Sequence, residues 1–353
     1  MAEVSVIIPV YNAGQYIEKC LDALCGQTFP DIEILCIDDG SSDDTWQHIT
    51  KYAAGDKRIR AWQQQNAGPA AARNRGLQNA TAPYIMFCDA DDWYEPDFCR
   101  RMLEIMKAEN TDTAVACCHV VVEDCDCAER EISESHYNSS LSGRFAMTDR
   151  LCQRTSVVLW NKIFKKELID RYGICFPEGC EHDDDVFWVL YGMVSKSVYF
   201  EKQKLYNYRI RPNSIMSNYF NRKPRDKYDR LKVSRFVVEF WHRGQLPAEK
   251  RAAVSDFCRT QISIMFFDLF SPEELEQIVA EANRMELDYC FAIRKGKIFM
   301  AQREGLEEAG RIKLLKYILL SKLTFGSKRK IYKQEKKTVR NQLRMKKLLG
   351  KAV

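Results

Sequence analysis

Three carboxylates stand together where an apolar run ends, in the stretch YIMFCDADDWYEPD that spans residues 84–97. Asp89, Asp91 and Asp92 follow residues typical of a buried strand. Because aspartate is a poor strand former, the cluster is expected just past the end of that strand. Like charges held this close repel one another and raise each other's pKa. A positive partner is therefore expected, either a neighbouring Arg or Lys side chain or a metal ion.

The elements that must position these carboxylates alternate along the first 125 residues. Strand-like segments are predicted at residues 4–11, 32–38, 58–64, 84–89 and 113–122. Helical segments are predicted at residues 15–27, 41–53, 68–80 and 96–108. This alternation predicts an α/β fold with a doubly wound, mostly parallel sheet. Ligands bind beyond the carboxyl ends of strands in such sheets. The residues expected to gather there are Pro9, Tyr11, Asp38, Asp39, Asp89 and Asp91.

In the rest of the chain, the predicted secondary structure changes at two points. Residues 133–143 are polar and Ser-rich, as loops are, and the chain from about residue 221 has the pattern of helices. We therefore expect three regions. They are a nucleotide-binding domain at 1–220, a helical C-terminal region at 221–310, and a basic amphipathic tail at 311–353.

The tail differs from the body in charge. Residues 311–353 contain fifteen Lys and Arg and a single acid, Glu335, which leaves 39 bases and 48 acids, a net of −9, in residues 1–310. Such tails bind polyanions, either nucleic acid or an anionic membrane surface. The stretch IKLLKYILLSKLTF mixes apolar residues with Lys, which favours a membrane interface. The alternative is a helix packed on the acidic body. No nucleic-acid-binding module is present, so nucleic acid is not an expected partner.

Composition narrows the class of protein. With 353 residues, 46% apolar and 29% charged, the chain suits a folded soluble protein of more than one average domain. It has no apolar run of membrane-spanning length and no signal-peptide pattern, so a cytoplasmic protein is expected. The fourteen cysteines form no CxxC pair and are expected to be reduced. A cysteine metal site around Cys125 is the alternative.

A series of motifs gives the chain a family likeness. VSVIIPVYNAGQYIEKCLDALCGQT, CIDDGSSDDT, NAGPAAARNRGL and FCDADDWYEPD come first, followed by WNKIFKKELI, EHDDDVFWVL and YNYRIRPNSI. Over roughly the first 215 residues, their order and spacing resemble family 2 glycosyltransferases. This is the large inverting family with the GT-A nucleotide-binding fold, which is Rossmann-like. The resemblance implies a hexosyl- or N-acetylhexosaminyltransferase that uses a nucleoside diphosphate sugar, with UDP as the expected nucleotide.

The resemblance assigns the acidic cluster to the donor and its metal. Asp89-Ala90-Asp91 is similar to the family's DxD motif. In that motif the first Asp contacts the ribose and the second binds the metal, so Asp91 is the implied ligand of Mn²⁺ or Mg²⁺. Such an ion neutralises the charge of the departing diphosphate. The alternative is an acidic N-cap for the helix after Pro96, a role that Asp92 can take.

The nucleotide base has its own implied partners. Pro9, Val10 and Tyr11 resemble the family's base-binding segment, and Asp39 matches the acid that accepts the uracil N3–H. Asp38 directly precedes Asp39 in the same segment. The alternative for this region is a polar turn that closes the strand, and both descriptions can hold together.

Two arginines resemble residues near the donor phosphates. Arg73 matches the arginine that faces them, with a surface salt bridge as the alternative. Arg211 and Ser214 resemble positions near the donor phosphate or the acceptor. The alternatives there are an ordinary turn and a surface ion pair.

An inverting transferase needs a general base to take the proton from the acceptor hydroxyl. Family members carry it in a Glu-Asp-x-x-Phe motif. Counting back from Phe187 places Asp184 at the base position, with Asp183 in place of the usual Glu. Asp183 or Asp185 serves instead if the register shifts, and the alternative is a helix N-terminus enriched in acids. His182 is expected to face solvent.

The implied function is transfer of a single sugar to a glycan or lipid-linked acceptor in surface polysaccharide biosynthesis. The transmembrane helices and the Q-x-x-R-W motif of processive members are missing. A lipid-linked acceptor would place the enzyme on the inner face of a membrane, and the basic tail would then bind that surface. One alternative is a nucleotidyltransferase acting on sugar phosphates, although VYNAGQY lacks the Lys of its Gly-rich loop. The other is nucleic-acid binding through the tail.

Overall fold

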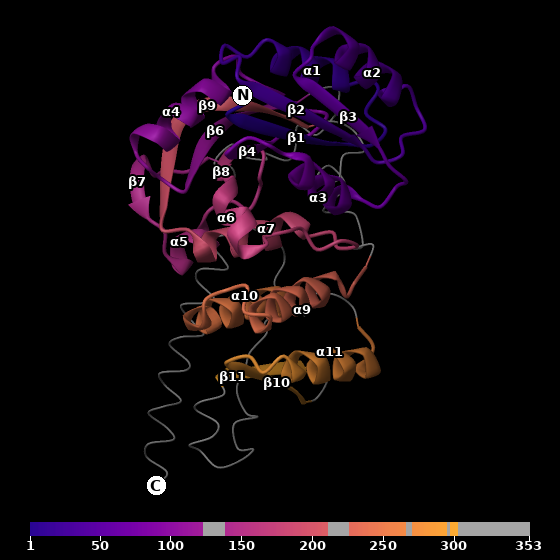
Figure 1. The fold of residues 1–353 in the computed structure, drawn as a ribbon. Coiled ribbons are helices and arrows are strands. Elements are labelled where there is room, and N and C mark those ends of the chain that lie inside the picture. The colour runs from indigo at the N-terminus through magenta and orange to yellow at the C-terminus, as the bar shows by residue number, and fades with distance from the viewer. Residues whose placement is uncertain (123–137, 211–225, 266–269, 295–296, 303–353) are drawn as a thin grey trace. The chain divides into compact units, whose positions relative to one another are not determined.

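The computed structural model describes residues 1–122, 138–210, 226–265, 270–294 and 297–302 (Figure 1). The chain divides into two compact units, Met1–Phe257 and Cys258–Val353. The domain boundaries expected at residues 220 and 310 fall outside the described residues, and so does the basic tail at 311–353.

The described residues of the first unit form a nine-stranded sheet with the order β3-β2-β1-β4-β8-β6-β9-β5, in which β7 pairs with β9. Strands β1 to β4 run parallel, and β6 runs parallel to β9. Strand β8 is antiparallel to both of its neighbours, β4 and β6. The strands are β1 Val4–Val10, β2 Ile32–Asp38, β3 Ile59–Gln63, β4 Tyr84–Phe87, β5 Trp93–Tyr94, β6 Thr113–Val122, β7 Gly143–Ala146, β8 Lys162–Lys165 and β9 Ser197–Ile210.

The five strands predicted in the first 125 residues are present. Every residue of β2 is buried, as is every residue of β1 except Pro9. Continuous Val and Ile runs form such strands because helices cover both faces of a parallel sheet. Figure 1 shows α1 and α2 on one side of β1 to β3 and α3 on the other.

The four predicted helices are also present, and others follow. Among the described residues of the first unit, the helices are α1 Ile17–Cys25, α2 Thr45–Gly55, α3 Pro69–Asn79, α4 Phe98–Ala108, α5 Asp149–Arg154, α6 Lys166–Tyr172, α7 Asp183–Val194 and α9 Asp229–His242. Helix α10, Arg251–Met265, spans the boundary between the two units.

Helix α3 packs directly on strand β1 at Gly76. It starts with Pro69 after Gly68, whose φ of 91° suits glycine. A Cβ atom added at Gly76 would lie 2.3 Å from Ile7 Cγ2 of β1. The missing side chain therefore lets α3 pack against β1, which fixes the helix that carries Arg73.

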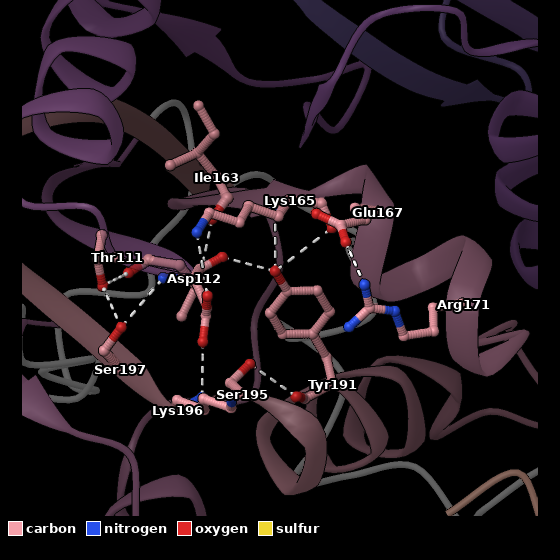
Figure 2. A network of polar contacts seen from close by, with 11 residues as sticks. Thr111, Asp112, Ile163, Lys165, Glu167, Arg171, Tyr191, Ser195, Lys196 and Ser197 are labelled. Carbon is pink, nitrogen blue, oxygen red and sulfur yellow. Dashed lines mark hydrogen bonds and ion pairs between the residues drawn. The ribbon is translucent and has the colours of Figure 1, made fainter.

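Helix α7 is tied to the sheet at its C-terminal end by a polar network around Asp112 (Figure 2). Tyr191 donates a hydrogen bond to the Asp112 carbonyl at 2.6 Å and accepts one from the Lys165 amide at 2.8 Å. The Asp112 carboxylate accepts from Lys165 Nζ at 3.1 Å and from the Lys196 amide at 2.7 Å. These bonds anchor the helix whose other end carries the acids of EHDDDVF.

The second unit contains helix α11, Pro272–Arg284, and a hairpin of β10, Tyr289–Arg294, and β11, Lys297–Gln302. A capping box of Ser271 and Glu274 starts the helix. The hairpin differs from the helical region expected at 221–310, because YCFAIR and KIFMAQ are rich in aromatic and β-branched residues. Within the described part of the chain, we find no helix with the length and apolarity to cross a membrane.

Candidate active site

Asp89 and Asp91 lie where the sequence places them, just past the carboxyl end of β4. Asp92 closes a turn there by donating its amide hydrogen to the Asp89 carbonyl at 3.1 Å. Both Asp89 and Asp91 keep part of their surface exposed, whereas Asp92 is 1% exposed. Two of the three carboxylates therefore remain accessible to a ligand.

Asp92 is not the helix cap suggested by the sequence, because α4 has Asp97 at its N-cap position. Its carboxylate instead accepts hydrogen bonds from the Tyr206 hydroxyl at 2.6 Å and the Arg209 amide at 2.7 Å. Burial raises the pKa of Asp92 well above its usual range. Asp92 thus joins the turn after β4 to strand β9.

Tyr206 secures the same turn a second time. Its hydroxyl accepts a hydrogen bond from the Asp89 amide at 3.2 Å while it donates to Asp92. Trp160 stacks on the Tyr206 ring, with centroids 4.4 Å apart and planes 16° apart. Sequence reasoning missed Tyr206, because nothing in YNY distinguishes this tyrosine from any other strand residue.

Arg73 is the positive partner of the acidic turn. Its Nη2 atom lies 3.5 Å from Asp89 Oδ1, and its Nη1 donates to Asp183 Oδ2 at 2.6 Å. The Arg73 side chain is 14% exposed, so the salt bridges of the alternative are present but lie below the surface, and the role of Arg73 at the donor phosphates stays a prediction. Burial alone would lower the pKa of Arg73, but the carboxylates around it, Asp183 first, outweigh burial and raise it.

This ion-paired group joins two motifs that are far apart in the sequence. Asp183 is the first residue of α7 and is 3% exposed, whereas Asp184 and Asp185 are partly exposed. The acids lie in the first turn of a helix, where the helix dipole favours negative charge. Through Arg73, the start of α7 is held beside the turn after β4.

Burial shifts two of these carboxyls toward neutrality. It raises the pKa of Asp89 to about 6, an effect that Arg73 opposes and Asp91 strengthens. Burial likewise raises the pKa of Asp184 to about 7, and the neighbouring Asp185 adds to this shift. A carboxylate with a pKa near neutral pH suits proton abstraction.

The sequence predicted that His182 faces solvent, but its ring is held between two side chains. Its Nδ1 lies 2.5 Å from Asp229 Oδ2, and its Nε2 lies 2.9 Å from Arg230 Nη2. Both partners are at the start of α9, a helix that sequence reasoning did not connect with the site.

The segment expected to bind the base combines buried and exposed residues. Pro9 and Val10 end β1, and Tyr11 follows with 53% of its surface exposed. An exposed aromatic ring at the carboxyl edge of the sheet offers a stacking surface. The role of all three in base binding stays a prediction.

Asp39 is 3% exposed and already engaged. Its carboxylate accepts hydrogen bonds from Gln64 Nε2 at 2.8 Å, the Ala67 amide at 2.9 Å and the Gly68 amide at 2.7 Å. Asp39 therefore secures the loop that leads into α3, a role that sequence reasoning missed. Its contact with a uracil N3–H stays a prediction.

Asp38 is likewise internal. It is fully buried and accepts from Gln63 Nε2 at 2.8 Å and from the Ser41 amide at 3.2 Å. These bonds close the turn after β2, which fits the structural alternative for the DDGSSDD stretch.

Lys162 of the WNK stretch is a buried cation that sequence reasoning also missed. Its Nζ donates to the Ser156 carbonyl at 2.8 Å, to Asn161 Oδ1 at 2.9 Å and to the Val158 carbonyl. Burial lowers the pKa of Lys162 to about 7, against the attraction of Asp184. Lys162 thus holds the loop before β8.

The remaining predicted residues, Arg211, Ser214 and Cys125, lie outside the described residues. Among the residues that are described, no group of three or more His, Cys, Asp or Glu side chains could hold a metal. Asp89 and Asp91 offer two accessible carboxylates, and Mg²⁺ is commonly bound by one or two carboxylates together with substrate phosphates. This donor set fits a divalent ion that is shared with a diphosphate.

These acidic groups lie beyond the carboxyl ends of parallel strands, where α/β sheets bind ligands, and Arg73 joins them to the acidic start of α7. Residues 5–173 match the model of glycosyl transferase family 2.

The relatives agree with this assignment. The chain is 32% identical over 229 residues to a putative glycosyltransferase, EpsH, of Bacillus subtilis, covering 61% of this chain and 63% of EpsH. It is 31% identical over 219 residues to the glycosyltransferase GlyA of Streptococcus pneumoniae, covering 60% of this chain and 31% of GlyA. The chain therefore spans less than two thirds of the length of these relatives.

A solved structure shows the same fold. The crystal structure of residues 1–349 of S. aureus TarS in complex with UDP-GlcNAc superposes with a TM-score of 0.65 at 21% identity. The match covers 86% of this chain and 98% of that one. The fold is thus the GT-A type, with a mostly parallel central sheet and helices in the C-terminal part, as predicted.

Proposed function

We propose that the protein is a metal-dependent inverting glycosyltransferase that transfers a single sugar from a UDP-sugar. The observation that carries the proposal is the bridge from Asp89 through Arg73 to Asp183. The bridge supports the proposal because it holds the turn with Asp89 and Asp91 beside the start of α7, where Asp184 is the proposed base. The family match disfavours the nucleotidyltransferase alternative.

Asp184 acts as the general base in this proposal. Its carboxylate is partly exposed at the start of α7 and has a pKa of about 7, so it can accept the proton of an acceptor hydroxyl near neutral pH. The deprotonated hydroxyl then attacks the anomeric carbon from the face opposite the nucleotide, which inverts the configuration there. The bond from that carbon to the diphosphate oxygen breaks, and UDP departs.

Asp91, with Asp89 beside it, would hold Mn²⁺ or Mg²⁺ together with the donor. When bound, the ion supplies charge neutralisation for the diphosphate leaving group. Arg73 cannot supply all of that charge itself, because two carboxylates already engage its guanidinium.

The donor and acceptor are inferred from relatives. TarS of similar fold was crystallised with UDP-GlcNAc, which supports a UDP-sugar donor, and Tyr11 offers an exposed ring for its base. We infer a glycan or lipid-linked acceptor of a surface polysaccharide, and a cytoplasmic enzyme at the inner face of the membrane. The basic residues of 311–353 would attract that anionic surface.

A donor-hydrolysis screen across UDP-, GDP- and dTDP-sugars with Mn²⁺ tests the proposal. We expect hydrolysis of one or more UDP-sugars, with none when the metal is chelated. Hydrolysis restricted to GDP- or dTDP-sugars would overturn the UDP assignment. Release of pyrophosphate from a nucleoside triphosphate and a sugar phosphate would instead identify a nucleotidyltransferase.

A further inference from the structure

Hydrogen bonds join the start of α9 to the residues that precede the acids of α7. Asp229 is 2% exposed and accepts from the Glu181 amide at 2.7 Å and the His182 amide at 3.2 Å. Its Oδ2 atom also lies 2.5 Å from His182 Nδ1, and Arg230 Nη2 lies 2.9 Å from His182 Nε2. We name these four residues, Glu181, His182, Asp229 and Arg230, the α9 latch.

The chemistry of the latch fixes the imidazole in one form. A guanidinium has only donors, so His182 Nε2 must accept from Arg230. The other ring nitrogen, Nδ1, then carries the proton and donates it to Asp229. Asp229 thus receives two backbone N–H groups and one ring N–H, and it holds both the main chain and the side chain at residues 181–182.

The latch lies directly next to the proposed base. Asp183, which follows His182, is held from another side by Arg73 at 2.6 Å. Asp184 is the next residue, and its Oδ1 accepts from the Asp185 amide at 2.9 Å. The backbone that carries Asp184 is therefore fixed by Asp229 before it and by Arg73 beside it.

We propose that Asp229 and His182 are positioning residues that hold the Asp184 carboxylate in place for proton abstraction. This inference rests on the proposed function, in which Asp184 is the general base. A base must lie within about 2.6–3.2 Å of the proton it removes. A displacement of about 1 Å caused by a distant substitution can cost about 10²-fold in rate.

Substitutions at His182 separate its two bonds. His182→Asn keeps an N–H group where Nδ1 stands and loses the contact with Arg230, whereas His182→Gln keeps an acceptor near Nε2 and loses the donor to Asp229.

Asp226→Asn is the matched control for Asp229→Asn, because Asp226 lies three residues earlier and pairs with Lys232 outside the latch. Thermal melting checks that each variant is folded.

The kinetic test uses the UDP-sugar that the wild type hydrolyses in the screen. We expect Asp229→Asn and His182→Gln to lower kcat by about tenfold or more with KM for the donor unchanged, as for a displaced base. His182→Asn and Asp226→Asn should stay within about twofold of the wild type. A fall in donor affinity without a fall in kcat would overturn the proposal.

Hydrogen–deuterium exchange of residues 181–185, measured without substrate, tests the latch itself. Exchange should rise by about tenfold in Asp229→Asn and His182→Gln, and it should not change in Asp226→Asn. Unchanged exchange in both latch variants overturns the proposal whatever the activity, and so does faster exchange with an unchanged kcat. A wild type that hydrolyses no sugar nucleotide contradicts the proposed function instead, and the exchange data still decide whether the latch exists.

Discussion

Asp89, Asp91 and Asp92 are adjacent in the sequence but have different environments. Asp89 faces Arg73, Asp92 is buried against Tyr206, and Asp91 keeps part of its surface exposed. Arg73 is therefore the positive partner of Asp89. Two neutral hydrogen-bond donors, the Tyr206 hydroxyl and the Arg209 amide, hold Asp92 instead. The role of Asp91 as a metal ligand stays a prediction.

Asp91→Asn should abolish sugar transfer while the fold persists. Losing one carboxylate weakens a site for a hard cation and leaves diphosphate charge uncompensated. Titration calorimetry of UDP with Mn²⁺ measures the effect. An affinity equal to that of the wild type would refute the assignment of Asp91 as the ligand.

Asp184→Asn should leave donor binding intact and lower transfer by roughly 10²-fold or more, because an amide does not accept the proton. In the wild type, activity should rise as the pH increases through about 7, since Asp184 is a base only when deprotonated and its pKa is about 7. A pH–rate profile measures this acid limb. A different result would move the base to Asp183. In that case Asp183→Asn binds the donor but transfers no sugar, whereas Asp184→Asn transfers sugar normally.

At the scale of elements, the turn after β4 depends on a strand that is more than a hundred residues away in the sequence. Tyr206 of β9 bridges the Asp89 amide and the Asp92 carboxylate. Tyr206→Phe leaves Asp92 buried without one donor, so it should destabilise the protein by about 1–3 kcal/mol. Urea unfolding measures the change in the free energy of unfolding.

Tyr199→Phe is the matched control, because Tyr199 lies on the same strand and is only partly buried. Its substitution should change stability by no more than about 0.5 kcal/mol. Equal losses in the two variants would show that the Tyr206 hydroxyl has no special role in the turn.

The close packing of α3 on β1 sets the position of Arg73. Gly76→Ala would place a Cβ atom 2.3 Å from Ile7 Cγ2. Overpacking of this kind costs about 1–3 kcal/mol, and the resulting shift of α3 should weaken donor binding as well. Gly55→Ala in α2 is the control, since nothing lies within 4 Å of its added Cβ. Thermal unfolding of the two variants should therefore differ, and equal melting temperatures would contradict this account of the packing.

At the scale of the whole molecule, the charge of the chain is divided between an acidic body and a basic tail at 311–353. If the tail anchors the enzyme, the full chain should bind liposomes rich in anionic lipid, with about 1 kcal/mol from each basic residue at the surface. Binding should weaken with salt as the Debye length shrinks, and the apolar residues should leave a salt-resistant part. Flotation at increasing salt measures this binding.

A chain that ends at Gly310 should lose liposome binding but keep metal-dependent donor hydrolysis, because the motifs of the site precede residue 215. If the shortened chain unfolds or aggregates, the tail packs on the acidic body. The membrane proposal would then be replaced by an intramolecular role for the tail.

The sequence by itself determined the parallel βα half of the fold and the place of its acids. Buried strands and amphipathic helices depend on residues a few positions apart, so hydrophobic periodicity predicts β1 to β4 and α1 to α4. Strand ends are equally local, which is why Asp89 and Asp91 could be placed at the edge of the sheet. Hairpin β10–β11 was missed, because short apolar runs do not distinguish strand from helix.

Only the tertiary structure decided which charges meet. Arg73 pairs with Asp183 across 110 positions of sequence, Tyr206 holds Asp92 across 114, and Asp229 holds His182 across 47. Such partners are chosen by the order of strands in the sheet and by the packing of α3, α7 and α9, and no local pattern encodes them. The pKa values of Asp89 and Asp184 depend on burial in the same way, because desolvation is a property of the assembled site.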